Sequence, residues 1–472
     1  MKQESTDLSA EQLIQQAFKF HSQGNISEAA KYYQVFLDKG FTDARVYSNL
    51  GQIFKEKGKL KKAELLTRQA IKLVSNFANA HSNLGIILRD LGKLKEAELS
   101  TRKAIELQPD LAIAHYNLGN ILTDLGKLEE AAVSYRKAIH LNPNYLDAYN
   151  NLVNVLVNLG NLEEAELSLV TAIELNPNNQ SINNNLINLL TIYKPNILSS
   201  NRFYTINEEF KRIDLNKINN EIITDNKAIQ IYRKGLDIYR KYDLNIETSL
   251  SQIYKRNKHN LNCKRHLMIF DQHKIIPEFC FECYKVQVEV DSIIELIKLF
   301  LVFNRLNLKD NNTRKCMVEM RPYVPGFYKG LIYCFGLKEA LEISKQINIQ
   351  IQNYIKTNLT SKVKRGCSEY PLEFPKYKEI RTSGDQPMKY DQNWKSIESE
   401  FDNSNQKWGV SHENLEGFNL NDFLIMRNWI AYAKRIGDQS VTKVTNEQIK
   451  IPRIYNLLKR DFHFEHTSNR VI

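Results

Sequence analysis

The sequence predicts a multidomain protein, in which an all-α superhelix of paired helices is followed by an α+β domain and a helical tail. A line of 34 residues recurs through the first part of the chain, and a different order of short apolar strands and helices follows it. At 472 residues, the chain is long enough for several domains with their own cores. We divide it into a solenoid, a helical linker, an α+β domain and a helical C-terminal extension at residues 1–195, 196–260, 261–375 and 376–472.

The repeat is clearest in two consecutive units. Residues 78–111 read ANAHSNLGIILRDLGKLKEAELSTRKAIELQPDL, and residues 112–145 read AIAHYNLGNILTDLGKLEEAAVSYRKAIHLNPNY. A fixed period of 34 residues indicates stacked helix hairpins, in which glycine ends the first helix, alanine lets the helices approach and proline stops the second helix. The recurring positions are Gly58, Gly92, Gly126 and Gly160, then Ala63, Ala97, Ala131 and Ala165, then Ala70, Ala104, Ala138 and Ala172, and finally Pro109, Pro143 and Pro177.

These recurring Leu-Gly, Gly, Ala, Ala and Pro positions resemble the tetratricopeptide repeat (TPR). The resemblance covers about residues 10–195. It implies antiparallel helix pairs stacked into a right-handed superhelix, with a concave groove lined by the first helix of each pair. We expect five repeats and a partial sixth, which keeps only a first helix near residues 180–193.

A column of asparagines stands one residue before the leucine of each first helix. Asparagine is a middling helix former, so helix propensity does not explain its recurrence. A row of carboxamides can bind the backbone of an extended peptide, and the array resembles in this the repeat superhelix of protein O-GlcNAc transferases. The alternative is that duplication copied a neutral surface residue. The predicted groove residues are Asn49, Asn83, Asn117, Asn151 and Asn185, with Asn120, Asn154, Asn188, Asp90 and Asp124 beside them.

Two pairs of metal-ligating residues follow the linker. Cys263-x-x-His266 and Cys280-x-x-Cys283 have the residue types and spacings of a four-coordinate zinc site. The second pair runs directly into an alternating strand, so buried cysteines without a metal are the alternative. A thioredoxin-like redox pair is disfavoured, because its first cysteine needs a helix N-terminus.

The α+β domain is predicted to be ferredoxin-like, with a four-stranded antiparallel sheet and helices on one face. Asp291 is a candidate N-cap for the first helix. The pattern β-α-β-β-α-β assigns strand 285–290, helix 291–306, strands 316–320 and 328–335, helix 337–357 and strand 362–367.

The third of these strands resembles the basic-Gly-aromatic signature of RNA-recognition domains. It reads Lys329-Gly-Leu-Ile-Tyr-Cys-Phe335, with Leu331 where a stacking aromatic residue is required. Packing in the core and on the face of the sheet explains these residues more simply than RNA binding does. Nucleic acid is therefore an alternative partner that the sequence disfavours.

The basic excess of the chain, +11, lies entirely in residues 196–472, because residues 1–195 carry equal numbers of basic and acidic side chains. Such a region can attract an anionic partner. Cys367 follows a basic strand but has no compelling base to activate it as a nucleophile. The predicted anion patch consists of Arg314, Lys315, Arg321, Lys329, Lys364 and Arg365.

The N-terminus lacks the basic start and apolar run of a signal peptide, and the most apolar window, 293–303, is too short and too charged to span a bilayer. We therefore expect a cytoplasmic protein. No P-loop, dinucleotide fingerprint, nucleophile elbow or HExxH motif is present, which argues against an enzyme.

The sequence thus predicts a protein–protein interaction protein that binds an extended peptide or partner helix in its groove, with a basic α+β module of unknown role. Zinc is the only cofactor considered. The alternatives are a transferase that recruits its substrates through the repeats, glycosyl transfer being the natural reaction, or an RNA-binding module. The C-terminal part lacks the Gly-rich nucleotide loops that such a transferase needs.

Overall fold

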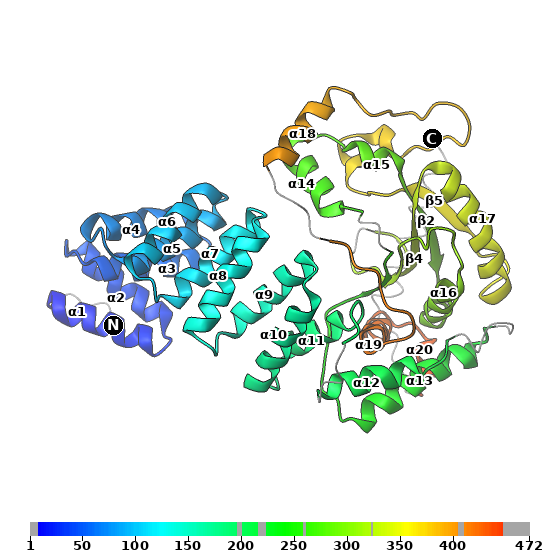
Figure 1. Ribbon diagram of the computed structural model, residues 1–472, viewed down its shortest axis with the longest axis horizontal. Coiled ribbons are helices and arrows are strands. Elements are labelled where there is room, and N and C mark those ends of the chain that lie inside the picture. The colour runs from blue at the N-terminus through cyan, green and yellow to red at the C-terminus, as the bar shows by residue number, and fades with distance from the viewer. Residues whose placement is uncertain are drawn as a thin grey trace. The chain divides into compact units, whose positions relative to one another are not determined.

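The computed structural model describes residues 8–195, 201–215, 223–257, 261–321, 324–404 and 410–446 (Figure 1). Its described residues form two compact units, one of which ends at Leu175 while the other begins at Asn176. We call the first unit the repeat array and the second the sheet domain. The boundaries at 195, 260 and 375 stay predictions.

The repeat array consists of helix hairpins that follow the predicted period. The four turn glycines have positive φ angles between 70° and 82°, as the left-handed C-cap requires. The recurring alanines are fully buried. The helices are α1 (Ala10–Ser22), α2 (Ile26–Asp38), α3 (Ala44–Glu56), α4 (Leu60–Leu73), α5 (Ala78–Asp90), α6 (Leu94–Leu107), α7 (Ala112–Asp124), α8 (Leu128–Leu141), α9 (Leu146–Leu159) and α10 (Leu162–Leu175).

Glycine in the first helix of a hairpin allows the second helix to approach closely. A Cβ atom at Gly85 would lie 2.0 Å from Oγ1 of Thr101, and one at Gly119 would lie 2.5 Å from the ring of Tyr135. Real Cβ atoms do not come this close to other heavy atoms. The Leu-Gly pair of the repeat is therefore a packing requirement, as the sequence predicts.

The sheet domain is built on one antiparallel sheet with the strand order β1-β3-β4-β2-β5. The helices and strands predicted between residues 285 and 367 are present, and the ferredoxin-like class stays a prediction. Ser292, rather than Asp291, caps the first helix by accepting from the Glu295 amide. The elements are β1 (Gln252–Lys255), β2 (Cys283–Val290), α16 (Ile293–Arg305), β3 (Arg314–Val318), β4 (Tyr328–Phe335), α17 (Leu337–Tyr354) and β5 (Ser361–Arg365).

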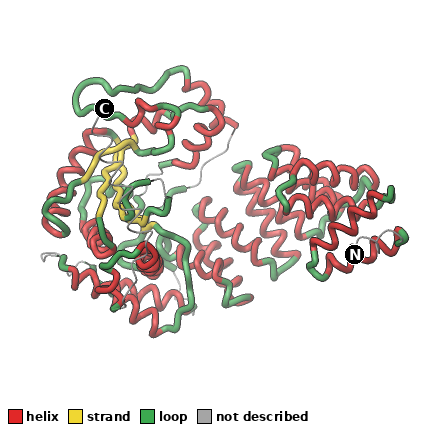
Figure 2. Tube along the Cα trace, turned by 180° about the vertical axis from the view of Figure 1, so that it is seen from behind, coloured by secondary structure: helices red, strands yellow, loops and turns green. Residues whose placement is uncertain are grey.

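Helices α16 and α17 cover one face of the sheet (Figures 1 and 2). On that face Val286 and Ile332 are fully buried. A Cβ atom at Gly330 would lie 2.7 Å from Leu299 and Phe303 of α16, so this glycine serves helix–sheet packing. Because side chains alternate along a strand, the residues between them point to the opposite face.

Helices far apart in the sequence pack around the sheet. The Trp429 side chain is fully buried, and its Nε1 donates to the Ser251 carbonyl at 2.8 Å. In the described part of the chain, no helix is long and apolar enough to cross a membrane. The remaining elements are α11 (Gln180–Leu189), α12 (Arg202–Lys211), α13 (Asp225–Lys241), α14 (Cys263–His273), α15 (Glu278–Glu282), η1 (Tyr370–Leu372), η2 (Pro375–Lys378), α18 (Trp394–Ser404), α19 (Leu420–Ile436) and α20 (Val441–Thr445).

Candidate functional site

The asparagine column of the array connects the first helices of neighbouring repeats. Asn83 Nδ2 on α5 donates to Ser48 Oγ on α3 at 3.1 Å. Asn117 Nδ2 on α7 donates to Ser82 Oγ on α5 at 3.0 Å. Each asparagine thus binds the hydroxyl that lies 35 residues before it. The column belongs to a polar network between repeats, which the sequence analysis did not foresee.

The network continues at both ends of the array. Asn151 Nδ2 donates to Tyr116 Oη at 3.3 Å and to Asn120 Oδ1 at 2.8 Å. Tyr135 Oη also donates to Asn120 Oδ1, at 2.8 Å. Asn49 Nδ2 donates to Tyr33 Oη at 3.1 Å. These bonds hold each amide group in one orientation.

The other predicted groove residues differ in their surroundings. Asp124 pairs with Arg89 of the preceding repeat, while Asp90 and Asn154 are exposed. Asn185 and Asn188 lie on α11, in the sheet domain. Each of the first four asparagines of the column therefore donates a hydrogen bond to the preceding repeat.

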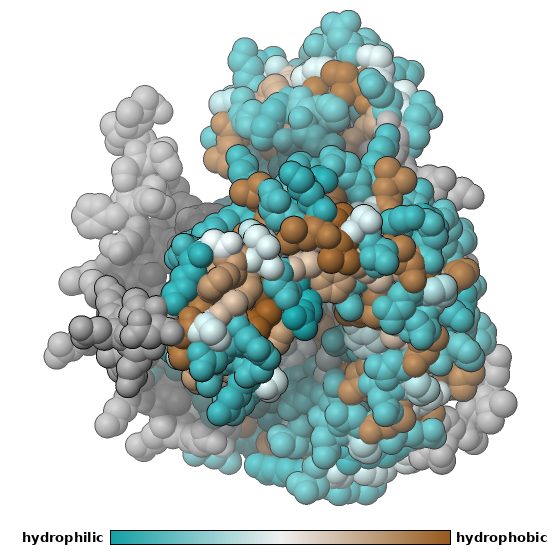
Figure 3. Space-filling view, turned by 90° about the vertical axis from the view of Figure 1, so that its left-hand side faces the viewer, coloured by the Kyte–Doolittle hydropathy of each residue, from teal (hydrophilic) through white to brown (hydrophobic). Residues whose placement is uncertain are grey.

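The second helices of the array expose aliphatic side chains at the same 34-residue period. Figure 3 shows brown hydrophobic residues among teal hydrophilic ones on one face of the molecule. The periodic residues are Leu65, Leu99, Val133 and Leu167, which are 60 to 71% exposed.

The sheet face opposite α16 and α17 forms a pocket of about 600 Å³. All five strands contribute side chains, because alternate residues of each strand point to this face. The strand residues that line it are Gln252 and Tyr254 of β1, Cys283, Lys285, Gln287 and Glu289 of β2, Lys315, Met317 and Val318 of β3, Lys329, Leu331 and Tyr333 of β4, and Lys364 of β5.

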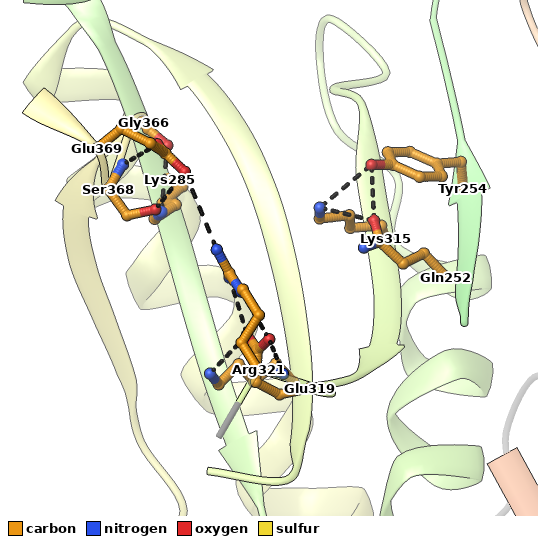
Figure 4. Close-up of polar contacts among 10 residues, drawn as sticks. Gln252, Tyr254, Lys285, Lys315, Glu319, Arg321, Gly366, Ser368 and Glu369 are labelled. Carbon is orange, nitrogen blue, oxygen red and sulfur yellow. Dashed lines mark hydrogen bonds and ion pairs between the residues drawn. The ribbon is translucent and has the colours of Figure 1, made fainter. Parts of the chain in front are cut away.

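At one end of this pocket, two lysines bind neutral acceptors (Figure 4). Lys315 Nζ donates to Gln252 Oε1 at 2.9 Å and to Tyr254 Oη at 3.2 Å. Lys285 Nζ donates to the Gly366 carbonyl at 3.1 Å. Burial, together with the like charge of Arg321, lowers the pKa of Lys315 to about 8. Burial also lowers the pKa of Lys285.

At the other end, the cations are paired with carboxylates. Glu319 accepts from Lys329 Nζ at 3.1 Å and from Arg321 Nε at 2.9 Å. Burial opposes the ionisation of Glu319, but the hydrogen bonds from Arg321 and the charge of Lys329 outweigh it and lower the pKa to about 2. Lys364 Nζ lies 3.9 Å from Glu289 Oε1. Glu369 also lines the pocket, where it lies 3.9 Å from Arg321, and its charge acts on Lys285 and Lys315 without forming an ion pair with either.

The predicted anion patch divides between two environments. Lys315, Arg321, Lys329 and Lys364 line the pocket. Arg314 is instead buried and donates from Nη1 to the Leu306 carbonyl at 2.9 Å. Arg365 is also buried and donates to the carbonyls of Phe281 and Tyr377. These two arginines satisfy backbone oxygens and do not contribute to the pocket.

The three cysteines among the predicted zinc ligands lie near Cys367. His266 is buried and stacks on Phe279, and Cys280 lies 3.4 Å from Tyr370 Oη. Cys263 and Cys283 line the pocket, where Cys367 joins them. Among the residues that the structure describes, no group of three His, Cys, Asp or Glu side chains could hold a metal ion. Nothing in this arrangement supports the zinc prediction.

Comparison with known protein families finds repeat matches between residues 44 and 179. The description "Tetratricopeptide repeat" matches residues 44–75, 78–111, 101–132 and 146–179, and "TPR repeat" matches residues 119–160. The array is a tetratricopeptide repeat array. Tetratricopeptide repeats generally mediate protein–protein interactions and scaffolding.

Solved TPR structures resemble the chain over the array. YrrB, described as "a TPR protein with an unusual peptide-binding site", is 22% identical over 39% of this chain and 93% of its own, with a TM-score of 0.31. The TPR protein TTC0263 of Thermus thermophilus is 17% identical over 39% of this chain and 99% of its own, with a TM-score of 0.34. MamA is 22% identical over 34% of this chain and 94% of its own, with a TM-score of 0.31. No curated protein matches the chain.

Sequence reasoning missed two features of these sites, although a signal existed for each. The hydroxyls that bind the TPR asparagines stand 35 residues before them, so a second column, Ser48, Ser82 and Tyr116, accompanies the first. Lys285 alternates with Gln287 and Glu289 along one face of its strand. To identify the residues of β3 and β4 that share this face with Lys285, one must know the order of the strands in the sheet. The alternation of residues along a single strand does not give that order.

Proposed function

We propose that this protein is an interaction scaffold whose TPR array binds an extended segment of a partner protein along the asparagine column. The proposal rests chiefly on one observation. Asn83, Asn117 and Asn151 each donate from the amide nitrogen to the preceding repeat. A carboxamide held in this way keeps its oxygen as a fixed hydrogen-bond acceptor.

A row of fixed acceptors suits the N–H groups of an extended backbone. Main-chain hydrogen bonds provide affinity for many sequences, whereas pockets beside the column select particular side chains. Because the amides are already oriented, binding loses little side-chain entropy at these positions. The proposed ligand is therefore an extended peptide with weak side-chain preference.

The test uses the full chain and a 12-residue peptide selected on it from a displayed random library. Fluorescence anisotropy then compares wild type with the triple variant N83A/N117A/N151A. We expect at least about tenfold weaker binding, because three acceptors are lost. Wild-type affinity in this variant would contradict the proposal.

A matched control separates recognition from stability. The triple variant S48A/S82A/Y116F removes the hydroxyl partners but keeps every asparagine. We expect it to lower Tm as much as the asparagine variant does but to weaken binding less, since the acceptors remain and only their fixed orientation is lost. Equal losses of affinity in both variants would show that the column acts only through the stability of the array.

A further inference from the structure

The sheet pocket is lined by more cations than carboxylates, because Glu289, Glu319 and Glu369 face five basic side chains: Lys285, Lys315, Arg321, Lys329 and Lys364. Within the described residues, neither Lys285 nor Lys315 makes an ion pair, and the acceptors are an amide oxygen, a phenol and a backbone carbonyl. Both side chains are half-buried. Withdrawing an ammonium from water without a counter-charge is costly, and a second cation in the same pocket raises the cost. The protein maintains this arrangement in a concave site, where an anionic ligand would relieve it.

The surroundings of the two lysines indicate the kind of anion. Lys315 Nζ lies 5.1 Å from the ring centroid of Tyr254 and 5.9 Å from that of Tyr333. Leu267 and Leu331 add apolar surface to the same pocket. A volume of about 600 Å³ is within the range of small-molecule sites. The pocket thus combines two point charges with aromatic and aliphatic walls.

We propose that this pocket binds a small organic phosphate, with the phosphate group on Lys285 and Lys315 and a ring-bearing body against Tyr254, Tyr333 and Leu331. Two ammonium groups match the charge of a phosphate monoester, and charge-assisted hydrogen bonds to its oxygens are stronger than those to the neutral acceptors they would replace or supplement. The site lies outside the TPR array, and the inference is independent of peptide binding.

Carboxylates at the other end favour a compact anion over a polynucleotide. Glu289 and Glu319 line the pocket beside Lys364 and Lys329, so these cations are already neutralised. A nucleic-acid strand that lay along the sheet would bring its phosphates against both carboxylates. Leu331 also replaces the stacking ring that single-stranded RNA uses on such a face. A nucleic-acid ligand is therefore an outcome that the test can detect, not the one we expect.

The experiment titrates the full chain with inorganic phosphate, phenyl phosphate and adenosine 5′-monophosphate by calorimetry at constant ionic strength. We expect both ring-bearing phosphates to bind more tightly than inorganic phosphate. K285Q and K315Q should each weaken phenyl phosphate binding at least about tenfold. Affinity should also fall above pH 8, because Lys315 loses its proton there.

K362Q is the matched control. Lys362 is exposed on β5 and does not line the pocket, so the substitution removes the same charge from the same domain. We expect it to change affinity by less than about twofold. Phosphate should raise the Tm of wild type and K362Q but not of K315Q, a readout that also confirms that each variant folds.

Three results would overturn the proposal. The first is the absence of saturable binding by all three probes up to about 10 mM. The second is equal weakening by K362Q and K315Q, which would reveal a diffuse positive field in place of a site. The third is tighter binding of a single-stranded oligonucleotide than of adenosine 5′-monophosphate, with a steep salt dependence, which would assign the face to nucleic acid.

Discussion

The TPR array and the sheet domain differ in how far apart in the sequence their ion-pair partners lie. In the array, one bond is repeated at a constant step, as in the ion pairs Arg68–Glu96, Arg102–Glu130 and Arg136–Glu164, each 28 residues apart. In the sheet domain, partners are unique and distant, as in Lys255–Asp422. Local contacts make stability a sum over neighbouring repeats, whereas distant contacts make a domain unfold as one unit. We therefore expect a destabilising substitution in the array to affect only neighbouring repeats, and one in the sheet domain to lower the stability of the whole domain.

The largest effect is expected from Trp429→Ala. The side chain is fully buried and joins α19 to the residue before β1. Its loss leaves a cavity and an unpaired carbonyl, and should cost about 3–5 kcal/mol. In urea unfolding followed by hydrogen exchange, all protected amides of the sheet domain should lose protection together, while those of the array keep theirs. The control Leu372→Ala, at an 88% exposed residue, should change stability by less than about 0.5 kcal/mol.

Glu319→Gln should have the next largest effect, because it removes one partner of a buried ion pair. The Glu319 and Lys329 side chains are 3% and 6% exposed, and loss of the carboxylate leaves the Lys329 charge uncompensated, at a cost of about 3 kcal/mol. The pKa of Glu319 falls from 4.5 to about 2 on folding. Its contribution is therefore complete above pH 4.5 and disappears as the pH falls towards 2.

Urea unfolding of wild type and Glu319→Gln across this pH range checks the prediction. The difference in unfolding free energy between the two proteins should shrink steadily below pH 4.5. A difference that stays constant with pH would mean that the carboxylate charge is not the source of the stabilisation.

The same contrast explains what could be predicted from the sequence. In the array, Gly51, Gly85 and Gly119 recur at the same position, so one argument about close helix packing covers three repeats, and the structure agrees. In the sheet domain, β1 was not predicted, because four residues at an edge carry too little pattern to distinguish a strand from a loop.

Spacing in the sequence was a weaker guide to the sites themselves. Cys280 and Cys283, which have the spacing of a ligand pair, lie on the short helix α15 and at the start of β2, and the zinc site stays a prediction. Arg314 was predicted to join Lys315 in the anion patch, but adjacent residues of a strand point to opposite faces. The asparagine column was assigned to the groove from its period alone. Its hydroxyl partners belong to the preceding repeat, and they become neighbours of the asparagines only when the repeats stack.

A matched pair of glycine substitutions tests the comparison directly. A Cβ atom at Gly119 would lie 2.5 Å from the buried ring of Tyr135, and one at Gly330 would lie 2.7 Å from Phe303. Both changes to alanine overpack a helix contact, and each should cost about 1–3 kcal/mol. Hydrogen exchange should show opening confined to α7, α8 and their neighbours for Gly119→Ala, but a lowering across the whole sheet domain for Gly330→Ala. Identical spreading in both would refute the proposed difference.

Arg102→Gln should have the smallest effect, although it also breaks ion pairs. Arg102 binds Glu98 of its own helix and Glu130 of the next repeat, both at 2.8 Å, but its side chain is 46% exposed. Water screens these charges, so the loss should be about 0.5 kcal/mol at low salt and should vanish near 1 M salt. Glu319→Gln, in contrast, should keep most of its cost in salt, because its partner Lys329 is shielded from solvent. If Arg102→Gln cost as much free energy as Glu319→Gln and were equally insensitive to salt, exposed ion pairs between repeats would stabilise the array as strongly as buried pairs do. The stability of the array would then depend on its charges and not on its alanines and glycines.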